Sequence, residues 1–144
     1  MARRSKIVLD SSVMVKWFTN EEGSPSALRI LDSFTNGSIS VMISALTFYE
    51  IANALTFKPD FSNGDVERCV SNLLQLELEV RELDDALLKE SAKIAYEGKV
   101  TFYDAIPVGI ARLEKTQCHG RSENSVPFAV KNGLSHKTAR MSCD

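Results

Sequence analysis

The sequence predicts an α/β fold, a three-layer αβα sandwich around a short and mostly parallel sheet. Short apolar runs alternate along the chain with longer amphipathic segments, which is typical of strand–helix units. The run at 6–10 lacks polar alternation, as expected of a strand buried on both faces. The chain has 144 residues, of which 44% are hydrophobic and 25% charged, so its size and composition suit one globular domain.

The elements expected in the first half begin and end at local signals. Ser24 and Pro25 start a helix, because serine caps helices and proline is favoured in the first turn. Asn36 and Gly37 end that helix. The sequence predicts a strand at 6–10, a helix from 11 to 18, a helix from 24 to 35, a strand at 39–43 and a helix from 44 to 57.

Similar signals divide the second half. Pro59 and the pair Asn63-Gly64 indicate a turn. The pair Asp84-Asp85 places negative charge at the positive end of a helix. Pro107 is compatible with the last helix if it lies in or near the first turn. The predicted elements are a turn at 59–64, a helix from 66 to 76, a strand at 80–83, a helix from 84 to 98 and a helix from 102 to 115.

The balance of acidic and basic residues changes after residue 115. Residues 1–115 hold 17 acids and 13 bases, whereas residues 116–144 hold 2 acids and 4 bases. An αβα fold requires a further apolar strand after the last helix, and 126–130 is the only candidate. Pro127 confines that candidate to a sheet edge or a strand start. We therefore expect a domain at 1–115 and an atypical tail at 116–144 that is frame-shifted or poorly ordered.

Composition excludes several classes of protein. The net charge of −2 excludes the strongly basic surface of a duplex-binding protein. No apolar run is long enough to span a membrane, and no signal peptide is visible, so we expect a cytoplasmic protein without membrane association. A zinc site is the alternative use of the tail, but its residues match no compact finger spacing. Those residues are Cys118, His119, His136 and Cys143.

Three carboxylates stand at the ends of predicted elements. Asp10 follows the first strand, Glu50 lies inside the third helix and Asp104 opens the last helix. Carboxylates that converge repel one another unless a cation is bound or one of them stays protonated. A site made only of oxygen ligands favours Mg²⁺ or Mn²⁺ over zinc. Such a site suits phosphodiester hydrolysis, in which the metal polarises the phosphate and activates water.

Three sequence blocks resemble the PIN-domain family. Residues 7–18 resemble its opening, in which an acid ends the first strand and a hydroxyl residue follows two places later. Residues 50–55, Glu-Ile-Ala-Asn-Ala-Leu, resemble its second block, and residues 101–105, Thr-Phe-Tyr-Asp-Ala, resemble its third. The blocks occur in the family order over residues 6–115. The resemblance is closest to the VapC-type toxins of toxin–antitoxin pairs.

The resemblance implies a PIN-like fold and a metal-dependent endoribonuclease with RNA as its substrate. It also implies a homodimer and inhibition by a cognate antitoxin. Asp10, Glu50 and Asp104 would be the catalytic residues and would bind Mg²⁺ or Mn²⁺. Ser12 would orient Asp10 or bound water, and Asn53 matches the second block.

Two further residues complete the predicted site. The family pattern places another acid after a fourth strand, and the corresponding position here is Glu123, although no apolar strand precedes it. Lys16, on the first helix near Asp10, is a candidate contact to RNA phosphate. The alternative function is a catalytically silent PIN-like module that binds an antitoxin or itself. A housekeeping RNA-processing nuclease differs only in substrate and partner.

Overall fold

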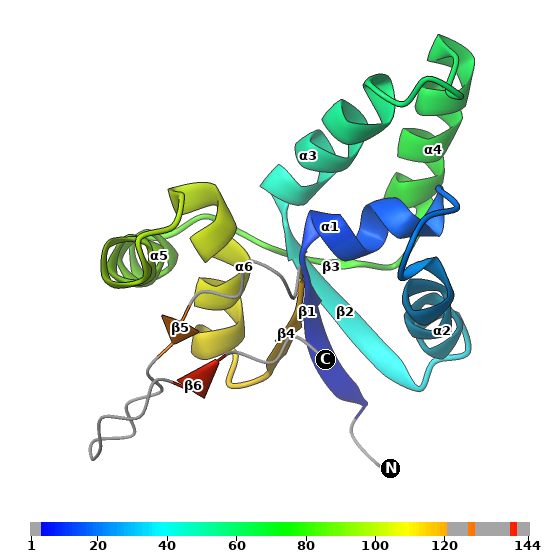
Figure 1. Ribbon diagram of the computed structural model, residues 1–144. Helices are drawn as coiled ribbons and strands as arrows, with labels where there is room; N and C mark the ends of the chain where they lie inside the picture. Colours follow the sequence, from blue (N-terminus) through cyan, green and yellow to red (C-terminus); the bar gives the residue numbers. More distant parts are fainter. Residues whose placement is uncertain (1–3, 121–126, 129–138, 141–144) are drawn as a thin grey trace.

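The computed structural model describes residues 4–120, 127–128 and 139–140. In this part of the chain, the main sheet has four parallel strands in the order β3-β2-β1-β4 (Figure 1). These strands are β1 (Ser5–Leu9), β2 (Ile39–Ser44), β3 (Glu79–Arg81) and β4 (Gln117–His119). Separately, β5 (Pro127–Phe128) pairs antiparallel with β6 (Ala139–Arg140).

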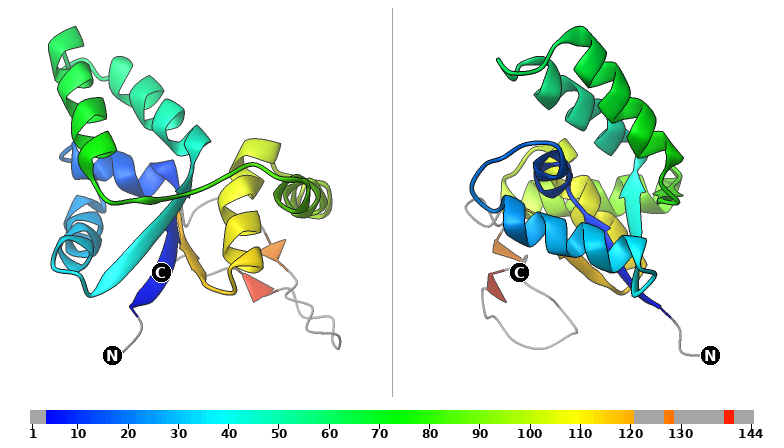
Figure 2. Two further views of the ribbon diagram at one scale, coloured as in Figure 1. Left: turned by 180° about the vertical axis from the view of Figure 1, so that it is seen from behind. Right: turned by 90° about the vertical axis from the view of Figure 1, so that its right-hand side faces the viewer.

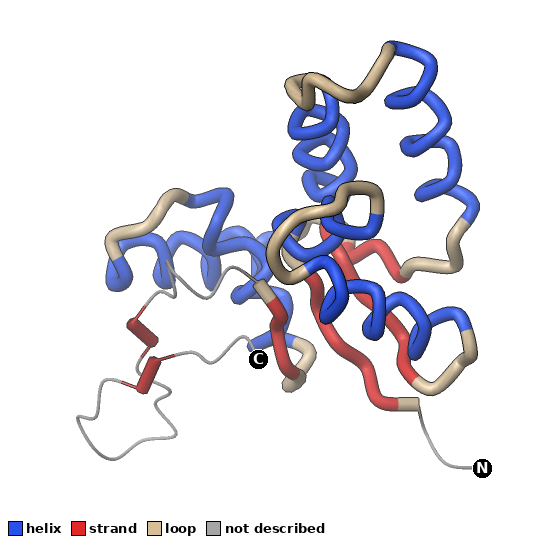
Figure 3. Tube along the Cα trace, turned by 45° about the vertical axis from the view of Figure 1, so that its right-hand side comes forward, coloured by secondary structure: helices blue, strands red, loops and turns tan. Residues whose placement is uncertain are grey.

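Helices cover both faces of the main sheet (Figure 2). The first group comprises α1 (Ser11–Met14), the 3₁₀ helix η1 (Val15–Trp17), α2 (Ser24–Thr35), α3 (Ala45–Thr56) and α4 (Asn63–Gln75). The second group comprises α5 (Asp85–Gly98) and α6 (Phe102–Leu113) on the opposite face. Figure 3 shows the strands between these two groups. The predicted three-layer αβα architecture is therefore confirmed.

Side chains along the two central strands point alternately to opposite faces of the sheet, and this produces two hydrophobic cores. Leu9 and Ile43 are completely buried against the first helix group. Val8 and Met42, which are paired across β1 and β2, pack instead with residues of α5 and α6. Successive side chains of a strand point to opposite faces, so an uninterrupted apolar run is buried on both sides.

The expectation that no strand directly follows the last helix is wrong. Gln117–His119 forms β4, which pairs in parallel with Ile7, Val8 and Leu9 of β1. Cys118 is buried against α6, and the Thr116 hydroxyl donates a hydrogen bond to the Lys6 carbonyl. The sheet thus extends past the boundary expected at residue 115. Of the strand expected at 126–130, the described residues Pro127 and Phe128 form β5, which lies against α5 rather than in the main sheet.

The turn expected at Asn63-Gly64 is also wrong, because α4 begins there. Ser62 accepts a hydrogen bond from the Asp65 amide, and the Asp65 carboxylate accepts one from the Ser62 amide at 2.8 Å. This reciprocal capping box satisfies donors at the start of the helix. The local pairing of serine with aspartate therefore outweighs the turn preference of the Asn-Gly pair.

Pro107 lies beyond the first turn of α6, further inside the helix than expected, and it is buried. Proline has no amide hydrogen, so the Tyr103 carbonyl one turn earlier has no helical donor at this position. Near the middle of the same helix, Gly109 is buried against α5. A Cβ atom at Gly109 would lie 2.7 Å from the Ser91 hydroxyl oxygen. Glycine is therefore required for the close approach of these two helices.

Gly109→Ala is expected to destabilise the protein by about 1–3 kcal/mol through overpacking. The same change should have a much smaller effect in a Ser91→Ala background. There the nearest remaining neighbours of the new methyl group lie at 3.5 Å, an ordinary contact. Urea unfolding of the two single variants and the double variant measures this coupling. Equal losses in both backgrounds would show that Ser91 is not the obstacle.

Ser91→Ala alone is expected to leave the stability unchanged or to raise it. The Ser91 hydroxyl is fully buried and has no hydrogen-bond partner among the described residues. A buried polar group without a partner is destabilising relative to an apolar one. A clear loss of stability in this variant, measured by the same urea unfolding, would contradict this prediction.

Candidate active site

The site lies where the strand order reverses. The chain adds β2 and β3 on one side of β1 and then returns to place β4 on the other side. In open α/β sheets, ligands bind at the carboxyl ends of the strands at such a reversal. Asp10 occupies this position, and its amide donates a hydrogen bond to the His119 carbonyl at 2.9 Å. The fold therefore places the first predicted acid at the expected edge.

Local bonds hold Asp10 in place. Its backbone is extended and its carbonyl accepts a hydrogen bond from the Val13 amide at 3.1 Å, so Asp10 begins α1 without using its carboxylate as a cap. The carboxylate instead accepts a hydrogen bond from the Ser12 hydroxyl at 2.7 Å. Ser12 thus restrains the orientation of the Asp10 side chain, and its role in a metal site stays a prediction.

Glu50 has a strongly perturbed carboxyl group. Partial burial, followed by the negative charges of Asp10 and Asp104, raises its pKa from 4.5 to about 7. A hydrogen bond with the Ser11 hydroxyl acts in the opposite direction. The three acids come from the residue that follows β1, from α3 and from α6, and both Asp10 and Asp104 lie close enough to Glu50 for their charges to act on it.

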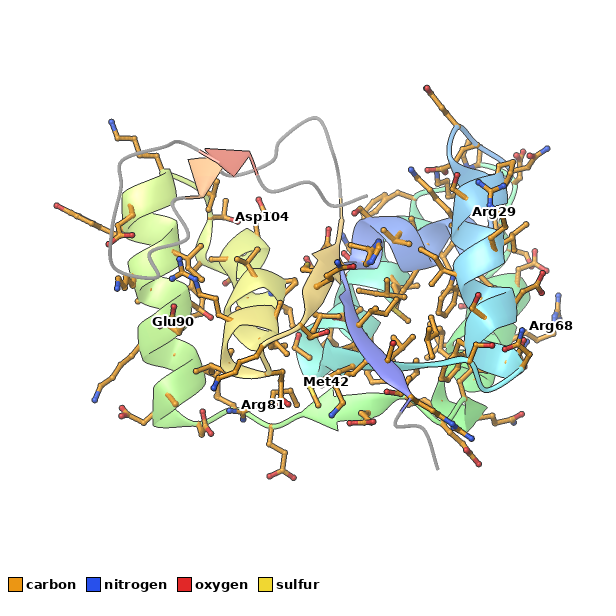
Figure 4. All side chains as sticks on the ribbon, turned by 90° about the horizontal axis from the view of Figure 1, so that it is seen from below. Arg29, Met42, Arg68, Arg81, Glu90 and Asp104 are labelled. Carbon is orange, nitrogen blue, oxygen red and sulfur yellow. The ribbon has the colours of Figure 1, made fainter. Side chains whose placement is uncertain are left out.

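Asp104 lies in the first turn of α6, where its side chain is exposed (Figure 4). The Thr101 hydroxyl caps this helix by accepting a hydrogen bond from the Asp104 amide at 3.1 Å. The pattern matches that of Ser62 and Asp65 in α4, but here the carboxylate makes no return bond to the described backbone. The cap is therefore complete without the Asp104 carboxylate, which remains available for another role.

The donor set matches Mg²⁺ or Mn²⁺ in chemistry, because it contains carboxylate oxygens and hydroxyls. Within the described ranges, however, no three acidic, histidine or cysteine side chains are gathered closely enough to hold one ion. Electrostatic repulsion acts over longer distances than metal coordination does. The raised pKa of Glu50 is therefore compatible with the absence of three gathered ligands among the described residues. The side chains are close, but they do not share one ligand sphere in this conformation.

The remaining predicted residues are placed differently. Asn53 is exposed on α3, one turn after Glu50. The Lys16 amine lies beside Gly23, where it would be 2.8 Å from an added Cβ atom. The hydrogen bond from Lys58 is the main cause that lowers the pKa of Glu21, and the charge of Lys16 adds to it. The RNA contact assigned to Lys16 stays a prediction. Glu123 lies outside the described residues.

The zinc alternative has little support. Cys118 and His119 are neighbours on β4, where successive side chains point to opposite faces of the sheet. His136 and Cys143, the other two residues of that alternative, lie outside the described residues. Cys118 is buried in the core with α6 rather than at the acidic edge.

Sequence reasoning missed two contributors to the site. No site role is predicted for Ser11, yet its hydroxyl forms a hydrogen bond with the carboxylate of Glu50 on another helix. The His119 carbonyl binds the Asp10 amide across β1 and β4. Neither contact has a local sequence signal, since each joins segments that are distant along the chain.

A family model described as the PIN domain matches residues 7–118. The chain belongs to the PIN domain family. In the described part of this PIN protein, no helix is both long and apolar enough to cross a membrane. No curated protein matches its sequence.

Solved structures share the fold at low sequence identity. A toxin–antitoxin complex from Klebsiella pneumoniae is 15% identical with a TM-score of 0.62, over 90% of this PIN protein and 96% of that chain. VapC20 of Mycobacterium tuberculosis, a toxin that cleaves the sarcin–ricin loop, is 16% identical with a TM-score of 0.65. The match covers 80% of this PIN protein and 88% of VapC20. FitAcB from Neisseria gonorrhoeae is 18% identical with a TM-score of 0.61, and the match covers 78% of this PIN protein and 85% of that chain.

Proposed function

We propose that this protein is a metal-dependent endoribonuclease and the toxin of a toxin–antitoxin pair. The observation that carries the proposal is the placement of Asp10, Glu50 and Asp104 at one edge of the sheet, where partial burial and then the charges of the two aspartates raise the pKa of Glu50. A fold that brings three carboxylates together against their repulsion is expected to bind a cation there. The PIN family match and the fold shared with toxin proteins support the choice of RNA as substrate.

In this proposal, Asp10, Glu50 and Asp104 hold Mg²⁺ or Mn²⁺. Such an ion, when bound, polarises a phosphodiester and lowers the pKa of water. The chain's own contribution is positioning. Ser12 fixes the Asp10 carboxylate at 2.7 Å, and the Ser11 hydroxyl binds Glu50 in its ionised form, the form that binds a metal.

Cleavage of a panel of structured RNAs tests the proposal. The panel includes a sarcin–ricin loop RNA, because VapC20 cleaves that element. We expect internal cleavage with Mg²⁺ or Mn²⁺ and none with EDTA. If no RNA in the panel is cut and calorimetry detects no binding of Mn²⁺, the nuclease assignment is wrong.

A second candidate is a catalytically silent PIN module that acts by binding a partner. One observation favours it, namely that no three potential ligands converge on one point among the described residues. Weak or absent Mn²⁺ binding in the same calorimetric experiment would support this candidate. Strong binding with metal-dependent cleavage would exclude it.

The proposed partners are a cognate antitoxin and a second copy of the chain. Solved structures with this fold include a toxin–antitoxin complex, which supports the antitoxin. Co-expression with the product of a small neighbouring gene is expected to suppress cleavage and to yield a stable complex. Light scattering of the purified protein measures whether it is a dimer.

A further inference from the structure

A pocket lies next to the acidic site, at the carboxyl ends of β2 and β3. Its volume is about 310 Å³, at the small end of the range for ligand pockets. It lies between the beginnings of α3 and α6 and one side of α5. Ser44, Ala45 and Leu46 line it from the start of the helix that carries Glu50, and Phe102 and Tyr103 line it from the residues just before Asp104.

We propose that this pocket binds an unpaired nucleobase of the RNA substrate. The inference rests on the proposed nuclease function and assigns the base of the bound nucleotide to this pocket. Because Phe102 and Tyr103 directly precede Asp104, a nucleotide whose phosphate is held at the acids can place its base here. Proteins that recognise unpaired RNA stack its bases on aromatic rings and on arginine planes.

The walls of the pocket offer such planes. Phe102 is half-buried, and Tyr103 is 61% exposed at the rim. Arg81 also lines the pocket, and its guanidinium forms ion pairs with Asp84 at 3.0 Å and with Glu114 at 3.6 Å. Because two acids neutralise its charge, Arg81 offers a flat stacking surface more than a free cation for phosphate.

The lining of the pocket matches the faces of a nucleobase, because most of the lining residues are apolar. The Ser91 hydroxyl takes no part in this, since it is fully buried and lies against Gly109 of α6. The two aromatic residues directly before Asp104 favour a base joined to a phosphate over the side chain of a second copy.

Binding of a fluorescent nucleotide tests the proposal. The probe is 2-aminopurine ribonucleoside 5′-monophosphate, whose emission changes on stacking, titrated in buffer with Mg²⁺. Tyr103→Ala is expected to weaken binding about tenfold or more, the loss typical of one stacking ring. Ala45→Trp, which fills the pocket from an exposed position, is expected to do the same.

Matched controls separate the pocket from general effects. Tyr96→Ala and Ala86→Trp change an exposed tyrosine and an exposed alanine on α5 that do not line the pocket, so neither should alter binding. Ribose 5-phosphate has the phosphate but no base and should compete poorly. Equal binding by Tyr103→Ala and Tyr96→Ala, or full competition by ribose 5-phosphate, would overturn the proposal.

Two further outcomes are decisive. If the pocket variants alter the oligomeric state but not nucleotide binding, the pocket is an interface between copies and the proposal is wrong. The probe contains no phosphodiester, so its binding does not depend on cleavage. Base binding that persists when neither RNA cleavage nor Mn²⁺ binding is detected would support the pocket while refuting the nuclease. Cleavage without base binding would refute only the pocket.

Discussion

Asp104→Asn is expected to reduce metal-dependent RNA cleavage by at least about 10²-fold, as is typical when a charged group that stabilises a transition state is removed. Asparagine keeps the shape of the side chain but removes the negative charge that would hold the cation. The first turn of α6 should remain intact, because its cap uses the Thr101 hydroxyl and the backbone amide of Asp104. The melting temperature should therefore stay unchanged. Rates under single-turnover conditions and thermal unfolding of the same preparations measure both effects.

Asp65→Asn is the matched control, since Asp65 occupies the equivalent position in α4. There the carboxylate accepts a hydrogen bond from the Ser62 amide, which lowers its pKa, and it pairs with Arg68. We expect this variant to lose stability and to keep its nuclease activity, the reverse of Asp104→Asn. An unchanged cleavage rate in Asp104→Asn would remove that residue from the active site.

Glu50→Gln is expected to stabilise the metal-free protein at alkaline pH. The pKa of Glu50 is about 7 in the folded protein and 4.5 without the influence of the fold. The folded state therefore binds this proton more tightly, and the associated stability is present below pH 4.5 and lost as the pH rises through 7. Such a shift corresponds to about 3 kcal/mol for a fully buried group, and screening at this half-exposed position reduces it to about 1–2 kcal/mol.

Urea unfolding at pH 5 and pH 8 measures this effect. The two proteins should differ little at pH 5, and the variant should be more stable at pH 8. Glu97→Gln changes an exposed glutamate on α5, and its stability should equal that of the wild type at both pH values. Mn²⁺ should stabilise the wild type at pH 8 far more than Glu50→Gln, because the ion offsets the repulsion among the carboxylates. An unchanged dependence on pH in Glu50→Gln would show that another group titrates.

The sequence predicts the position of each acid well because element boundaries have local signals. Asp10 follows a continuous apolar strand, and Thr101 marks the start of the helix that contains Asp104. Strands β1 and β2 are also clear, since both of their faces are buried. What the residues alone do not predict is the distance between the acids, which depends on how α3 and α6 pack against the sheet.

The failures of prediction have physical causes. Gln117–His119 has no apolar pattern, and it forms a strand because β1 offers unpaired backbone groups beside it. Tertiary pairing therefore outweighs the weak local preference of three polar or small residues. The start of α4 had a local signal in the Ser62 and Asp65 pair, which the neighbouring Asn-Gly sequence obscured. The pocket has no sequence signal, because its walls come from four separate segments, 44–46, 81–83, 87–91 and 102–106.

The pairing of β1 with β4 also determines when the acidic edge can form during translation. The bond between Thr116 and Lys6 joins residues 110 positions apart, and the Asp10 amide finds its acceptor only at His119. Contacts so distant in sequence form late and slow the folding of a chain. A nascent chain on the ribosome therefore has Asp10 and Glu50 long before it has Asp104 and the strand that completes the sheet. Whatever activity these residues support begins only after nearly the whole domain has been synthesised and released from the exit tunnel.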